Sequence, residues 1–247
     1  MRYLLLATCL ASIGARSFSQ TAGQIIAKAE EAIRGKSSRG TFEMTVVTPE
    51  FTRTLTMKSW WVGTQKSFME IEAPKKEAGN KWLKIGNEMW NYLRATETTI
   101  KIPPSMMLQS WNGSDFTNDD LARESSLSKD YTARLMGEEP IDGEPTWKLE
   151  LIPKPEAPVV WGKVYIWVRK NDLLPSVEQF FDEKGTLIRY LVYSEVKRMG
   201  GRTIPTVWTM YNKAKPGHRT EFKIIDIAFD IEIPDRIFSL RELERGN

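Results

Sequence analysis

The chain has 247 residues and a formal net charge of +3, with 35 Lys and Arg residues against 32 Asp and Glu residues. This length suits one large domain or two small ones and is long enough to bury a core. Charges of both signs alternate along the chain, which excludes the clustered basic face of a nucleic-acid-binding protein.

The first 19 residues have the pattern of a secretory signal peptide. Arg2 precedes a mostly apolar run over residues 4–13, and small residues at Ser17 and Ser19 suit a signal peptidase. The run is too short to span a bilayer permanently. We therefore expect cleavage after residue 19 and a mature domain over residues 20–247, the alternatives being a buried N-terminal helix and lipid attachment at Cys9.

Residues 21–34 are predicted to form an amphipathic helix. Ile25, Ile26, Ala29 and Ile33 recur at helical spacing, and Gly35 follows as a stop signal. From residue 40 the apolar period changes to two, which is typical of strands. The first half then contains predicted strands over 40–48, 52–62, 66–74, 81–94 (two strands around a turn at Gly86) and 98–103.

The second half repeats this pattern after an irregular stretch over residues 103–130. Predicted strands cover 131–139, 146–153, 163–170, 176–185, 186–196, 203–213 and 220–233. The only other convincing helical segment lies around 117–128, and two helices cannot cover a flat sheet of this size. A closed barrel and a sandwich are alternatives, but a mainly β (α+β) fold with one strongly curved antiparallel sheet and helices on its concave side fits best.

Residues for catalysis or metal binding are scarce. His218 follows a Pro-Gly turn, and no G-x-S-x-G motif supplies a nucleophile for it. With one histidine and no cysteine in the mature chain, zinc sites of the usual type are excluded. We predict no catalytic residue, no metal and no cofactor, and hence a protein that is not an enzyme.

The acidic cluster at Asp115, Asn118, Asp119 and Asp120 resembles a calcium loop only superficially. Counted from Asp115, the sixth position is not glycine and the twelfth is not glutamate. Thr117 and Asp120 instead have the spacing of a capping box at a helix N-terminus. We interpret this stretch as the start of a helical lid, with lid or cap residues Gly113, Ser114, Asp115, Thr117, Asn118 and Asp120.

Tryptophan and methionine are concentrated in the first half of the chain. Five of the nine tryptophans lie between Trp60 and Trp111. For any single residue a place in the sheet core is the simpler interpretation, but together they offer broad, adaptable apolar surface. The predicted cavity residues are Met57, Trp60, Met69, Trp82, Met89, Trp90, Tyr92, Met106, Met107, Trp111 and Phe116.

The stretch from Met69 to Leu121 resembles the outer-membrane-lipoprotein-sorting-like proteins, the LolA/LolB-like group, and in particular a subfamily typified by a treponemal protein. The later segments "GRTIPTVWTM" and "IPDRIFSLRELER" fit the same pattern. Asn112, Ala95 and Thr98 depart from it. The matching residues of the central motif are Glu70, Pro74, Gly79, Leu83, Trp90, Tyr92, Ile102, Ser105, Met107, Gln109, Ser110, Gly113, Ser114, Asp115, Phe116, Asn118, Asp120 and Leu121.

This resemblance implies an unclosed β-barrel whose helices form a lid over an apolar cavity. It implies a periplasmic protein that binds the acyl chains of a lipoprotein or phospholipid, contacts membranes transiently and works with an RND-type inner-membrane exporter. An envelope sensor of the RseB type is the main alternative. An envelope hydrolase and a purely structural protein are the others.

Overall fold

The computed structural model describes residues 20–122, 127–157 and 159–246. The predicted signal peptide, including Cys9, lies outside these residues. Within the described part of the chain, no helix combines the length and the apolar character that crossing a membrane requires.

Thirteen strands form one sheet in which every neighbouring pair is antiparallel. The strands of the first half are β1 (Ser37–Val47), β2 (Thr52–Val62), β3 (Lys66–Ala73), β4 (Lys81–Ile85), β5 (Glu88–Leu93) and β6 (Thr98–Lys101). Those of the second half are β7 (Tyr131–Glu138), β8 (Thr146–Pro153), β9 (Lys163–Arg169), β10 (Pro175–Phe181), β11 (Leu187–Met199), β12 (Arg202–Asn212) and β13 (Arg219–Phe229).

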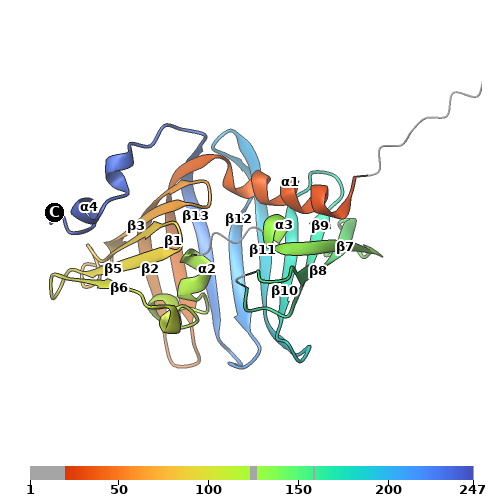
Figure 1. Ribbon diagram of the computed structural model, residues 1–247, viewed down its shortest axis with the longest axis horizontal. Coiled ribbons are helices and arrows are strands. Elements are labelled where there is room, and N and C mark those ends of the chain that lie inside the picture. Colours follow the sequence, from red (N-terminus) through yellow and green to blue (C-terminus); the bar gives the residue numbers. More distant parts are fainter. Residues whose placement is uncertain (1–19, 123–126, 158, 247) are drawn as a thin grey trace, which may run out of the picture.

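The sheet consists of two meanders joined at their ends. The strand order is β6-β5-β4-β3-β2-β1-β13-β12-β11-β10-β9-β8-β7, so the last strand pairs with the first and the sheet does not close into a barrel. Residues 102–130, which we call the crossing connection, must therefore run from one open edge of the sheet to the other. This segment includes α2 (Asn118–Ala122) and α3 (Leu127–Asp130), and Figure 1 shows α2 in front of the middle strands.

Helix α1 (Ala22–Arg34) covers the same face of the sheet. Thr21 caps its N-terminus in a reciprocal capping box with Gln24, and Gly35 ends it with a positive φ of 65°. Its buried residues Ile25, Ile26 and Ala29 pack on inward-facing residues of β7 to β12. We call the face beneath α1 and the crossing connection the inner face.

The C-terminal segment covers one end of the outer face. After β13 the chain forms a short 3-10 turn (Asp235–Ile237) and α4 (Leu240–Leu243). Phe238 and Leu243 pack there on Phe68, Leu83 and Tyr92 of β3 to β5. Each strand in this region therefore buries both of its faces, which explains the adjacent tryptophans Trp60 and Trp61 of β2.

The predicted fold class is confirmed, and the strands lie close to their predicted bounds. Residues 52–62 and 146–153 form strands over those same ranges. The predicted second helix is shorter than expected, because the described part of the crossing connection contains two single-turn helices and two 3-10 turns. The C-terminal helix α4 was not predicted, since four residues carry too short a pattern to show helical periodicity.

Candidate functional site

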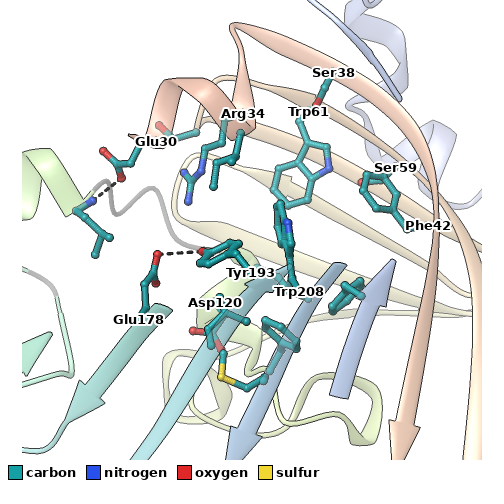
Figure 2. Close-up of a pocket in the computed structure, with 18 of the residues that line it drawn as sticks. Glu30, Arg34, Ser38, Phe42, Ser59, Trp61, Asp120, Glu178, Tyr193 and Trp208 are labelled. Atoms are coloured by element: carbon teal, nitrogen blue, oxygen red, sulfur yellow. Dashed lines mark hydrogen bonds between the residues drawn. The ribbon is translucent and has the colours of Figure 1, made fainter. Parts of the chain in front are cut away.

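A cavity of about 270 Å³ lies between the inner face of the sheet and the helices. Its walls come from α1, from α2 and the start of α3, and from strands on both halves of the sheet. Figure 2 shows side chains from all of these directions pointing into one space. The cavity is therefore formed by the whole fold and not by a local motif.

Most of the lining is aromatic or aliphatic. Trp208 contacts Tyr193 edge-to-face, with ring centroids 5.6 Å apart, and Trp161 contacts Phe180 at 5.4 Å. Phe222 contacts Phe116 of the crossing connection at 4.9 Å. Aromatic pairs of this kind are favourable beyond the area that they bury, and they make this part of the cavity wall apolar.

The crossing connection is anchored by Trp111, which is fully buried between Trp82 and Phe222. Asn112 and Gly113 follow with positive φ angles of 47° and 73°, a conformation that asparagine and glycine tolerate best. The chain then turns back so that the Trp111 N–H donates to the Phe116 carbonyl at 2.8 Å. This tight turn brings Phe116 over β13.

Helix α2 begins at the predicted capping box. The Thr117 N–H donates to the Asp120 carboxylate at 2.8 Å, and the Asp120 N–H donates to the Thr117 hydroxyl at 3.2 Å. The other predicted cap residues hold the connection in place: Asp115 accepts from Thr220 of β13 at 2.9 Å, and Asn118 donates to the Met106 carbonyl at 3.0 Å. The acidic cluster thus fixes backbone, and no group of three or more His, Cys, Asp or Glu side chains suited to a metal occurs among the described residues.

A buried ion pair ties α2 to the sheet. Arg189 of β11 donates from both terminal nitrogens to the Asp120 carboxylate, at 2.6 and 2.5 Å, and its guanidinium lies 4.5 Å from the ring centre of Trp161. Burial opposes ionisation of Asp120, but the charge and hydrogen bonds of Arg189, together with Thr117, outweigh it and hold the pKa of Asp120 below its usual value. Asp120 is therefore a structural anion and not an acid for chemistry near neutral pH.

Glu178 of β10 is the unusual titratable group of the cavity. Its residue is 8% exposed, and its Oε1 accepts a hydrogen bond from the Tyr193 hydroxyl at 2.9 Å. Burial raises the pKa of Glu178 to about 7, and the charge of Glu30 adds to this effect while the Tyr193 hydrogen bond opposes it. Figure 2 shows Glu178 and Tyr193 facing Glu30 and Arg34, which come from α1.

One hydroxyl of the lining lacks a partner. Ser59 of β2 is 2% exposed, and its Oγ makes no hydrogen bond within the described part of the chain. A buried hydroxyl without a partner is costly and is rare in native proteins. Because Ser59 lines the cavity, an acceptor atom on a ligand would satisfy it.

The structure separates the predicted cavity residues into three groups. Met57, Met69 and Phe116 line the cavity. Trp82, Met89, Met107 and Trp111 lie on the inner face in the packed cluster beside it, and Met106 lies in a 3-10 turn of the connection with its carbonyl bonded to Asn118. Trp60, Trp90 and Tyr92 do not face the cavity, because the strand alternation directs them to the outer face beneath α4.

Sequence reasoning missed the wall formed by the second half of the chain. Cavity residues there are Trp161, Glu178, Phe180, Leu191, Tyr193, Trp208, Met210, Phe222 and Ile224. Period-two pairs such as Leu191 and Tyr193, or Trp208 and Met210, were a usable signal for a shared face. Which face of the sheet they occupy depends on where α1 packs, and local periodicity does not contain that information.

The fold, a single antiparallel sheet with helices on its inner face, is shared by several solved structures. A DUF1329 family protein from Desulfovibrio piger matches with a TM-score of 0.81 and 22% identity, over 90% of this chain and 97% of that one. A domain from Vibrio parahaemolyticus named for outer membrane lipoprotein sorting matches with a TM-score of 0.78 and 22% identity, over 91% and 98%. A LolA superfamily protein from Nitrosomonas europaea gives 0.76 and 24%, over 91% and 100%.

Residues 63–245 match a family model that is described as an uncharacterized protein, and the chain belongs to that family. A comparison with curated proteins gives no match. The predicted resemblance to lipoprotein-sorting-like proteins is thus confirmed, and at these identities the solved structures establish the fold alone.

Proposed function

We propose that this protein is a periplasmic carrier that binds the acyl chains of a lipoprotein or phospholipid in the inner-face cavity and transfers them between envelope membranes. The observation that carries the proposal is the cavity itself, a space of about 270 Å³ with mostly apolar walls beneath a helical cover. This volume lies just below the roughly 300–1,000 Å³ of typical ligand pockets. It suits one chain better than several.

Two further features support a carrier over an enzyme. Among the described lining residues, Glu178 is the one acid with a pKa near neutrality, and none is a histidine, cysteine or lysine that could act as a second catalytic group. The unpartnered Ser59 hydroxyl suits a ligand with an ester or amide carbonyl, as acyl lipids have, better than a plain hydrocarbon. The expected signal peptide, transient membrane contact and RND-type exporter as transfer partner belong to the same proposal.

Lipid binding is tested first by extracting the native protein and identifying bound lipid by mass spectrometry. Soluble acyl ligands of increasing chain length should then bind with rising affinity, by up to about fourfold per methylene, because each buried methylene contributes about 0.8 kcal/mol. Equal affinity for short and long chains would contradict a carrier that buries the chain.

The cavity is tested by a pair of substitutions on neighbouring residues of β13. Ile224 lines the cavity and is 4% exposed, whereas Ile225 points outward and is 45% exposed. Ile224→Trp should fill the space and weaken long-chain binding by roughly tenfold or more, since about two methylenes of contact are lost. Ile225→Trp is the matched control and should leave binding unchanged. Near-ultraviolet circular dichroism of both variants establishes that the fold is retained, and unaltered binding by a folded Ile224→Trp variant would place the ligand elsewhere.

A further inference from the structure

Polar groups are gathered at one end of the cavity. Glu30 and Arg34 reach it from the last turns of α1, and Glu178 and Tyr193 face them from β10 and β11 (Figure 2). Glu30 accepts hydrogen bonds from the Leu127 and Ser128 N–H groups at 2.6 and 3.2 Å, so its carboxylate is held in position by α3. The end near α1 therefore differs in chemistry from the apolar remainder.

Glu178 has an unused acceptor in this region. Its only hydrogen bond among the described residues is the one from Tyr193, and it forms no ion pair there. Arg189 is committed to Asp120 by two hydrogen bonds. The charges of Arg34 and Arg189 favour the ionised form of Glu178, but neither side chain forms an ion pair with it in the described part of the chain. A buried carboxylate without a paired cation is destabilising, so a cationic group on a ligand would find a favourable position beside Glu178.

Aromatic rings complete the surroundings of this carboxyl group. Tyr193 and Trp208 are in edge-to-face contact, and both line the cavity with Trp61 and Trp161. The faces of such rings attract ammonium groups. A carboxylate in a cavity that is also lined by aromatic rings is a combination that recognises a ligand cation.

The cavity lining also contains charged residues. Among the described residues of the lining, Glu30, Asp119, Asp120 and Glu178 are acidic and Arg34 is basic. Asp120 is neutralised by Arg189, and Glu30 is held by hydrogen bonds from Leu127 and Ser128. Arg34 forms no hydrogen bond or ion pair through its guanidinium within the described part of the chain, so it is available to a phosphate group next to the cation.

We propose that this end of the cavity is a head-group subsite for an acyl lipid that carries both an ammonium and a phosphate, as phosphatidylethanolamine does. Glu178 with the Tyr193 and Trp208 rings receives the ammonium, and Arg34 receives the phosphate. The acyl chain extends along the apolar walls toward Met57 and Met69. This inference rests on the proposed function as an acyl-chain carrier and adds the class of lipid.

The test compares three single-chain lipids with the same acyl chain: lysophosphatidylethanolamine, its N-acetylated form, and lysophosphatidylglycerol. The first should bind about tenfold more tightly than the other two, because only it carries an ammonium that can contact Glu178 and the rings. Competition with a fluorescent fatty acid, monitored by calibrated displacement, gives the three dissociation constants. Equal affinity for the three lipids would overturn the proposed subsite.

Substitutions then assign the preference to residues. Glu178→Gln should lower the ratio of the affinities for the ammonium lipid and for lysophosphatidylglycerol from about ten to about one. Arg34→Gln should weaken all three phospholipids by a similar factor and leave a long-chain alcohol unaffected. Glu183→Gln, in the exposed turn after β10, is the matched control and should change nothing.

The outcomes separate this inference from the proposed function. If no acyl ligand binds, the carrier function itself is wrong; if all bind without preference, only the head-group subsite is wrong. Should Glu178→Gln lose its fold, Trp208→Leu provides the second measurement, with the same expected loss of selectivity. An unchanged preference in a folded variant of either kind contradicts the proposal.

Discussion

At the scale of single residues, Glu178 is the clearest departure from a generic apolar interior. It lies on β10 in the sequence "SVEQFF", where Val177 and Phe181 occupy one face and Glu178 and Phe180 the other. Each face carries one aromatic residue and at least one polar residue, Gln179 on the first face and Ser176 and Glu178 on the second, so the alternation gives no indication of which face is inside. A buried acid of this kind makes the stability of the fold depend on pH, because burial disfavours its charged form relative to its neutral form.

The stability of the protein should therefore depend on pH between about 4.5 and about 7 through Glu178. Since the folded pKa is raised, the folded state binds more protons in this range, and the free energy of unfolding falls as pH rises through it by roughly 3 kcal/mol and is flat above. In the described part of the chain, the other charged or titratable groups that line this region or contact its lining are Glu30, Arg34, Asp119, Asp120, Arg189 and Tyr193. Denaturant titrations at several pH values in this range measure the free energy of unfolding as a function of pH. This free energy should vary less with pH for Glu178→Gln, whereas Glu183→Gln should behave as the wild type.

The affinity for an ammonium lipid in the proposed subsite should also depend on pH, in the opposite direction to the stability. A cation beside Glu178 favours the ionised carboxylate, so binding of the ammonium lipid should strengthen as pH rises through about 7. The same titration with lysophosphatidylglycerol provides the comparison, because that lipid has no cation to couple to Glu178.

At the scale of elements, the crossing connection is held by two kinds of polar contact. The first is the local cap between Thr117 and Asp120, and the second is the ion pair between Asp120 and Arg189 of β11. Thr117 and Asp120 form the cap of α2 within three residues, as their spacing predicts. The ion-pair partner of Asp120 is Arg189, which is 69 residues away in the sequence and whose side chain is 4% exposed. The local half of this arrangement was readable from the sequence, and the distant half was not.

The helix cap and the ion pair should differ in their contribution to the free energy of unfolding. Thr117→Ala removes part of a helix cap and should cost roughly 0.5–2 kcal/mol in the free energy of unfolding. Asp120→Ala removes the cap and also leaves the Arg189 charge buried without its partner, which should cost roughly 3–5 kcal/mol. Equilibrium denaturation of both variants measures this difference, and equal losses would show that the ion pair contributes little.

At the scale of the whole molecule, one sheet supports two separate apolar regions. The inner face holds the cavity and its neighbouring cluster, and the outer face of β3 to β5 holds Phe68, Leu83 and Tyr92 beneath α4. Neighbouring residues of one strand thus serve different regions, as Met69 and Phe68 do on β3. Substitutions can therefore weaken one region without altering the other.

Leu243→Ala provides a test of this separation. The side chain is fully buried on the outer face, so its truncation should lower the free energy of unfolding by roughly 2–5 kcal/mol. Acyl-ligand affinity of the folded variant should stay unchanged, because no atom of the cavity wall is removed. Met57→Ala, a comparable truncation on the inner face, should lower both stability and affinity, and a loss of affinity in Leu243→Ala would show that the two regions are coupled.

The sequence by itself determined the local elements: the helix over residues 21–34 with its stop at Gly35, the period-two strands, and the cap at Thr117 and Asp120. These depend on local propensity, hydrogen bonding and periodicity, which are properties of neighbouring residues. Only the tertiary structure decided which residues share the cavity. Trp60, Trp90 and Tyr92 lie on the outer face. Arg34, Glu178, Trp208 and Phe222 line one cavity, because the pairing of β13 with β1 and the path of the crossing connection bring together residues that no sequence spacing relates.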